Sequence, residues 1–184
     1  MTVRAESEGP VPAESEPRSP DEPPADRLAP GAADLEAVSR LLGRSPAGDF
    51  AVVVRTDDGA PAVIENAPFL FDGTPMPTRY WLVDPSLREA VSRLESTGGV
   101  RQAEAEVPAR QVADTHARYA AERDALIAPD HRGPLPSGGV GGTRQGVKCL
   151  HAHLAWWLAG GEDPVGEWAA ERIGLWPSTA PARA

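Results

Sequence analysis

The chain has 184 residues, a formal net charge of −9 and a single cysteine. Its length suits one domain with its own core. An acidic chain lacks the electrostatic footprint of a duplex nucleic-acid-binding protein, which excludes that class of partner. A lone cysteine excludes an intrachain disulfide framework. Without an apolar signal segment or a membrane-length apolar run, we expect a cytoplasmic protein that does not bind membranes.

The beginning of the chain differs in composition from the rest. Residues 1–33 hold seven prolines and seven acidic residues but few large apolar side chains. Such a segment buries too little apolar surface to offset its conformational entropy. The composition therefore predicts a disordered, acidic, proline-rich tail over residues 1–33, one domain over residues 34–176 and a frayed tail over residues 177–184.

The first half of the domain has the pattern of a helix followed by a hairpin. A helix is expected over residues 33–44, with Asp34 as N-cap and Gly43 at its end. Two β-rich runs then flank an Asp-Gly turn, which is a strong hairpin signal. In chain order the expected elements are strands over residues 50–55 and 61–66, an ordered loop over residues 66–77 and a third strand over residues 78–83.

The second half is helical. Asp84-Pro85 and Asp163-Pro164 are typical helix starts, with the aspartate as N-cap. The expected elements are helices over residues 84–97, 101–127 with a break near Pro108, 147–161 and 163–176, with a long loop over residues 129–146. Strands first and helices afterwards indicate an α+β fold. We expect a small antiparallel sheet of about three strands packed with four to five helices.

The stretch GGVGGTRQGVKCLHAH (138–153) carries the strongest chemical signal. A helix N-terminus offers unpaired N–H groups and partial positive charge, and here basic residues lead into it. The spacing is not that of a P-loop, because Val147 stands where that motif has lysine. We predict a site for a small phosphate-type anion, formed by Arg144, Gly146, Lys148, His151 and His153, with Arg79 and Glu65 from the sheet.

Three other interpretations of this helix stay open. On an ideal helix Cys149 and His153 share one side, while His151 faces elsewhere, so only His153 readily approaches Cys149. An enzyme, a hydrolase or transferase of a phosphorylated small molecule, would use Cys149 as nucleophile and His153 as base. Alternatively, Cys149 and His153 hold zinc. The third alternative is a buried structural helix, and no cofactor is required.

The polar segment over residues 101–127 suggests a further function. Only Val112, Tyr119 and Leu126 form an apolar seam along it. A helix with so thin a seam lies on the surface or meets a partner. The alternative function is therefore a protein-interaction module that offers residues 101–127 to a protein partner.

Two long blocks of the sequence resemble a known family. They are the ENAP…DGTP.PT.YWL block and the VKCLHAH…AGG.DPVG block, and the similarity extends from about Leu41 to Trp168. The chain is identified as a member of the largely actinobacterial family called domain of unknown function 501. The resemblance implies a cytoplasmic protein. The genes of its relatives lie near those of an exopolyphosphatase-like phosphatase and a septum-formation initiator, which implies a phosphate-type ligand or a role in cell division or at the envelope.

One departure from the family bears on the metal hypothesis. Many relatives carry cysteine around the positions of Arg55 to Gly59, where this chain has Thr56, Asp57 and Asp58. Such cysteines would join the one in the KCLH block to hold a metal. Either the family holds no metal in this way, or this chain has lost those ligands.

Overall fold

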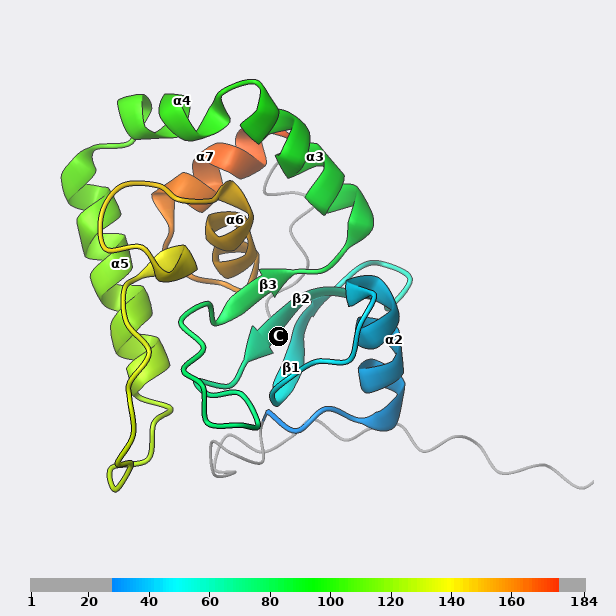
Figure 1. Ribbon diagram of the computed structural model, residues 1–184. Coiled ribbons are helices and arrows are strands. Elements are labelled where there is room, and N and C mark those ends of the chain that lie inside the picture. Colours follow the sequence, from blue (N-terminus) through cyan, green and yellow to red (C-terminus); the bar gives the residue numbers. More distant parts are fainter. Residues whose placement is uncertain (1–27, 176–184) are drawn as a thin grey trace, which may run out of the picture.

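The computed structural model describes residues 28–175, and within them it has a three-stranded sheet and six α-helices (Figure 1). This confirms the predicted α+β class, with one helix more than expected. The predicted tails lie largely outside the described residues. The elements are α2 (Ala32–Leu42), β1 (Phe50–Arg55), β2 (Pro61–Asn66), β3 (Tyr80–Leu82), α3 (Pro85–Ser96), α4 (Gly99–Glu106), α5 (Ala109–Asp124), the 3-10 turn η1 (Val140–Gly142), α6 (Leu150–Leu158) and α7 (Pro164–Arg172).

The sheet is antiparallel, in the order β1-β2-β3. The predicted hairpin is present: Thr56 donates its N–H to the carbonyl of Ala60, and Gly59 takes a positive φ of 83° that glycine adopts without strain. The third strand is shorter than expected, and it pairs with β2 in the register Val63 with Leu82. β3 is the edge strand of this sheet, so side chains from both of its faces can lie along the open edge.

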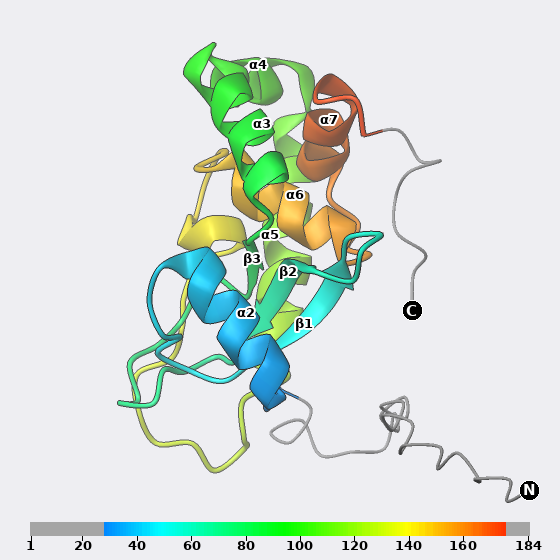
Figure 2. The same cartoon turned by 90° about the vertical axis from the view of Figure 1, so that its right-hand side faces the viewer.

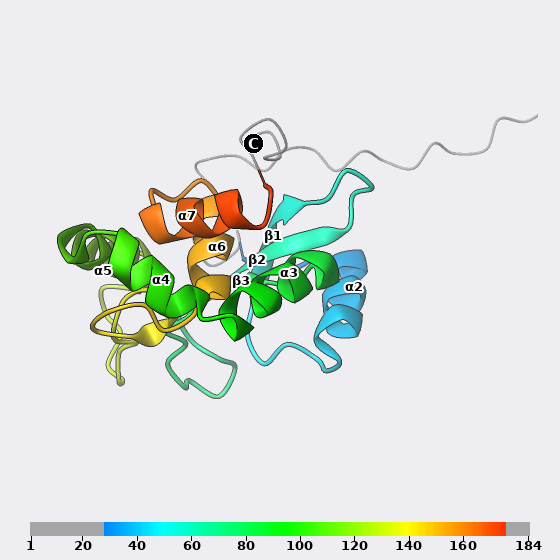
Figure 3. The same cartoon turned by 90° about the horizontal axis from the view of Figure 1, so that it is seen from above.

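The two faces of the sheet belong to two apolar clusters. On one face α2 contributes Val38, which packs with Phe50, Ile64 and Val83. The other face meets α6, which packs against α7, and Figures 2 and 3 show α2 on one side of the sheet and these two helices on another. All six residues of β2 are buried because both faces of that strand are covered. This packing fixes β3 beside α6, the helix that carries the predicted chemistry.

The aspartates that precede prolines cap their helices as predicted. Asp84 and Asp163 accept hydrogen bonds from backbone N–H groups in the first turns of α3 and α7. The prediction for Asp34 is wrong, because α2 begins earlier, with Gly31 at the N-cap position. Asp34 therefore lies within the first turn, where its carboxylate binds the Arg55 guanidinium at 2.8 Å.

The polar segment over residues 101–127 forms two helices, α4 and α5, which meet at Pro108. Proline has no N–H to donate and ends the helical hydrogen bonding there. The buried face of α5 is wider than the predicted apolar seam, because it adds polar residues: it consists of Val112, Thr115, His116, Tyr119 and Arg123. Binding of a protein partner through this segment stays a prediction.

None of the helices within residues 28–175 combines the length and the apolar character needed to cross a bilayer.

Candidate metal centre

The helix predicted over residues 147–161 begins three residues later than expected, because α6 starts at Leu150. Cys149 has φ −158° and ψ 120°, so it is the extended N-cap residue and not part of the helix. Helical spacing therefore does not apply to it. Its Sγ lies 3.7 Å from Nδ1 of His151. The prediction that only His153 approaches Cys149 is wrong, because it assumed helical geometry from residue 147 onward.

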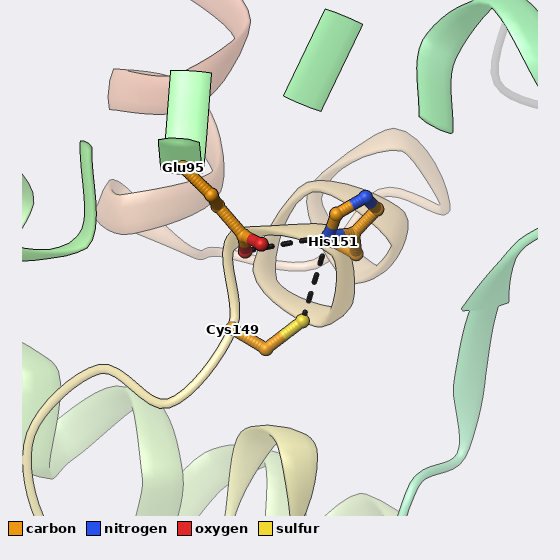
Figure 4. A group of neighbouring side chains, drawn as sticks. All are labelled: Glu95, Cys149 and His151. Carbon is orange, nitrogen blue, oxygen red and sulfur yellow. Dashed lines mark hydrogen bonds and ion pairs between the residues drawn. The ribbon is translucent and has the colours of Figure 1, made fainter. Parts of the chain in front are cut away.

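A carboxylate from α3 completes a cluster with these two side chains. Oε1 of Glu95 accepts the N–H of Leu150 at 2.6 Å and lies 3.3 Å from Nδ1 of His151. Glu95, Cys149 and His151 each offer a ligand atom, and these atoms lie within 4.8 Å of one another. Figure 4 shows the three side chains pointing toward one another from α3 and the start of α6. The cluster is partly open, since the side chains of His151 and Glu95 are 25% and 27% exposed.

The other ring nitrogen of His151 fixes how the imidazole is oriented. Nε2 lies 3.2 Å from the carbonyl oxygen of Arg88 and 3.2 Å from Oγ of Ser92. A carbonyl only accepts, so Nε2 carries a proton and donates it. Nδ1 then faces the sulfur of Cys149 and the carboxylate of Glu95. Metal-binding histidines are typically held in this way, with the second N–H donated to a carbonyl or carboxylate.

The cluster favours positive charge at Nδ1. The hydrogen bond with Cys149 raises the pKa of His151, with further contributions from the charges of Cys149 and Glu95, while partial burial acts in the opposite direction. A proton bound at Nδ1 stabilises the thiol sulfur and the carboxylate that converge on it. A metal ion placed among the same three atoms supplies that positive charge instead.

A hollow of about 700 Å³ adjoins the cluster. It is bordered by β3, by α3 and by the start of α6, and both Cys149 and His151 line it. A molecule in the hollow is therefore in contact with two of the three cluster residues.

The residues predicted to bind an anion are spread over several places. Arg144 and Gly146 line a separate hollow of about 330 Å³ beside His116, and neither borders the larger one. Nζ of Lys148 donates to the carbonyl of Gly141 at 3.2 Å. His151 lies in the cluster described above. The structure does not gather the glycine-rich loop and the histidines around one cavity.

The backbone donors near the start of α6 contact carboxylates of the protein itself. The N–H of Val147 donates to Glu104 at 2.9 Å, and that of Leu150 donates to Glu95 at 2.6 Å. These are the kind of N–H groups that would otherwise attract a bound anion.

His153 has a different environment from the one expected. It is fully buried, and its Nδ1 lies 2.7 Å from Oδ2 of Asp163, whose side chain is also fully buried. Nδ1 donates to this carboxylate, while Nε2 of His153 has no hydrogen-bond partner among the described residues. Oδ1 of Asp163 accepts the N–H groups of Val165 and Gly166. The pair thus joins α6 to the N-terminus of α7, away from Cys149.

Arg79 and Glu65 pair with each other. Nη2 and Nε of Arg79 donate to Oε1 of Glu65 at 2.7 and 2.9 Å, and both side chains are buried. Nη1 of Arg79 also donates to Glu122 at 3.0 Å. The guanidinium also lies 4.9 Å from the ring centre of Tyr80. Neither member of the pair lines the hollow beside the cluster.

Glu95 is the member of the cluster that the sequence did not predict. It lies on α3, far from the KCLHAH block in the chain, and only the packing of α3 against α6 brings it to Cys149. One local signal was available. Glu95 lies in the last turn of its helix, where the helix dipole disfavours a carboxylate, so it needs another partner.

The described residues form an α+β fold with a Glu–Cys–His cluster at the rim of a hollow. A family model described as "Protein of unknown function (DUF501)" matches residues 52–171, more than half of the chain. The chain belongs to this family, as the two sequence blocks indicated, and all three cluster residues lie within the matched segment. No curated protein and no solved structure matches the chain.

Proposed function

We propose that the protein binds a divalent transition-metal ion through Glu95, Cys149 and His151. The observation that carries the proposal is the convergence of these three ligand atoms within 4.8 Å of one another. Thiolate, imidazole and carboxylate together are the donor set that zinc prefers among the common biological ions. The carbonyl of Arg88, which accepts from Nε2 of His151, supplies the outer contact that such a ligand needs.

The ion would keep one coordination position for a small molecule. Structural zinc sites have four protein ligands, whereas catalytic sites have three plus a water or substrate. Among residues 28–175 the cluster offers three, and it borders the hollow of about 700 Å³. Zinc held in this way lowers the pKa of bound water to about 7. This supports metal-assisted hydrolysis, or binding of a small ligand at the ion, as the function.

The small anionic ligand expected from the sequence fits this centre better than the glycine-rich loop. Near that loop, the N–H groups of Val147 and Leu150 already donate to carboxylates. At the cluster, the ion itself would attract the anion.

A second candidate is a metal-free thiol enzyme. It is favoured by the contact of 3.7 Å between Sγ of Cys149 and Nδ1 of His151, and by the place of Cys149 at the N-terminus of α6. A thiolate in such a position is activated as a nucleophile, with His151 and not His153 as its partner. This candidate requires no ion, so the measurement of zinc affinity separates the two.

Replacing Glu95 with glutamine is expected to weaken zinc binding about 100-fold, because an amide oxygen is a poorer ligand than a carboxylate. The dissociation constant is measured by competition with a chromophoric zinc chelator on the untagged full chain. Glu89→Gln is the matched control, since Glu89 lies on the same helix, outside the cluster, and pairs with Arg93. Equal zinc affinities in the two variants, or no zinc binding by the wild type, contradict the proposal.

A further inference from the structure

The hollow beside the cluster has an apolar wall. Its apolar lining comes from the end of α2, the edge strand β3, the start of α3 and α6, and it consists of Leu42, Tyr80, Trp81, Leu82, Pro85 and Ala152. Trp81 is only partly buried, so part of its indole remains available for contact. The volume of the hollow, about 700 Å³, lies in the range of small-molecule sites, which are mostly apolar with a few polar groups.

Two charged side chains, Arg88 and Glu89, line the hollow. Arg88 lines it and is exposed, and its guanidinium has no ion pair among the described residues. The neighbouring acid, Glu89, is paired with Arg93. Pairing of Glu89 with Arg93 leaves the Arg88 guanidinium available to a ligand in the hollow. An apolar wall with a free guanidinium complements a molecule that is apolar at one end and anionic at the other.

We infer that the hollow binds a small organic anion with an aromatic or branched apolar body. The body packs against Trp81 and the neighbouring apolar lining, and the anionic head is bound by the metal ion and by Arg88. This inference rests on the proposed function, because the ion is one of the two groups that hold the head. Carboxylates and phosphate-type groups share this chemistry, and the experiment separates them.

The test uses the zinc-loaded full chain with four probes of known structure. 3-Phenylpropionate and phenylphosphonate carry both an aryl body and an anionic head. 3-Phenylpropanamide lacks the charge, and acetate lacks the body. Calorimetric titration is expected to show at least tenfold tighter binding of one or both aryl anions than of either control probe. The tighter of the two aryl anions identifies the head group.

Two variants locate the site. Arg88→Gln is expected to weaken binding of the aryl anion about tenfold, because one charge-assisted contact is lost. Zinc affinity should not change, since His151 contacts the backbone carbonyl of Arg88 and not its side chain. Arg110→Gln, at an exposed arginine of α5 that does not line the hollow, is the control and should leave both affinities unchanged.

The outcomes separate the inference from the proposed function. If zinc binds but neither aryl anion does, or if Arg88→Gln binds the anion like the wild type, the inference is wrong and the metal centre stands. If the chain binds no zinc, the proposed function fails. If the chain bound no zinc but still bound the aryl anion through Arg88, the inference that the ion and Arg88 hold the anionic head together would also be wrong.

Discussion

Replacing Glu65 with alanine is expected to lower the free energy of unfolding by about 3–5 kcal/mol, because it leaves the buried Arg79 guanidinium without its main partner. The two side chains are only 2% and 8% exposed, and they are joined by two hydrogen bonds. Burying an unpaired charge costs far more than the pair itself contributes. Urea denaturation followed by circular dichroism measures the loss.

Glu122 provides the control for this prediction within the same network. It also pairs with Arg79, at 3.0 Å, but its side chain is 46% exposed. Solvent can replace it, so Glu122→Ala should cost at most about 1 kcal/mol. The double variant Glu65→Leu with Arg79→Met should recover most of the lost stability, since it removes both charges at once. If Glu65→Ala and Glu122→Ala lowered the free energy of unfolding equally, burial would not determine how much the Arg79–Glu65 pair contributes, and the prediction would be wrong.

Replacing Asp163 with alanine is expected to destabilise the fold by about 2–5 kcal/mol, because two separate contributions are lost. One is the N-cap of α7, where Oδ1 accepts two backbone N–H groups. The other is the bond of 2.7 Å to His153, whose buried Nδ1–H would have no acceptor. The loss should also loosen the packing of α7 on α6, the helix that carries His151.

Asp84→Ala is the matched control for Asp163→Ala. Asp84 also precedes a proline and caps its helix, with a bond of 2.8 Å to the N–H of Leu87, but it pairs with no buried histidine. The control should lose about 1 kcal/mol, the usual value of a cap. Thermal and urea unfolding of both variants give the comparison. If Asp163→Ala costs no more than Asp84→Ala, the buried pair contributes nothing beyond the cap.

Much of the fold could be predicted because its signals are local. The Asp-Gly turn identified the hairpin, the two Asp-Pro pairs identified helix starts, and Pro108 identified the break between α4 and α5. Each signal depends on the conformational preferences of a few consecutive residues. The start of α6 was misplaced because the extended backbone of Cys149 depends on the tertiary contacts of that residue.

The site was less predictable because it depends on long-range packing. The histidine beside Cys149 is His151 and not His153, because the helix begins at Leu150 and not at Val147. Glu95 enters the site only because α3 packs against α6. Arg79 and Glu65 were predicted to bind a ligand, but they pair with each other, and Glu122 of α5 binds the same guanidinium.

X-ray absorption spectroscopy of the zinc-loaded chain tests the metal centre most directly. The account predicts one sulfur at about 2.3 Å from the ion and nitrogen or oxygen neighbours at about 2.0–2.2 Å. The sulfur should vanish in Cys149→Ser, which removes the only cysteine of the chain. A wild-type spectrum without sulfur, or one that Cys149→Ser leaves unchanged, would contradict a centre built on Glu95, Cys149 and His151.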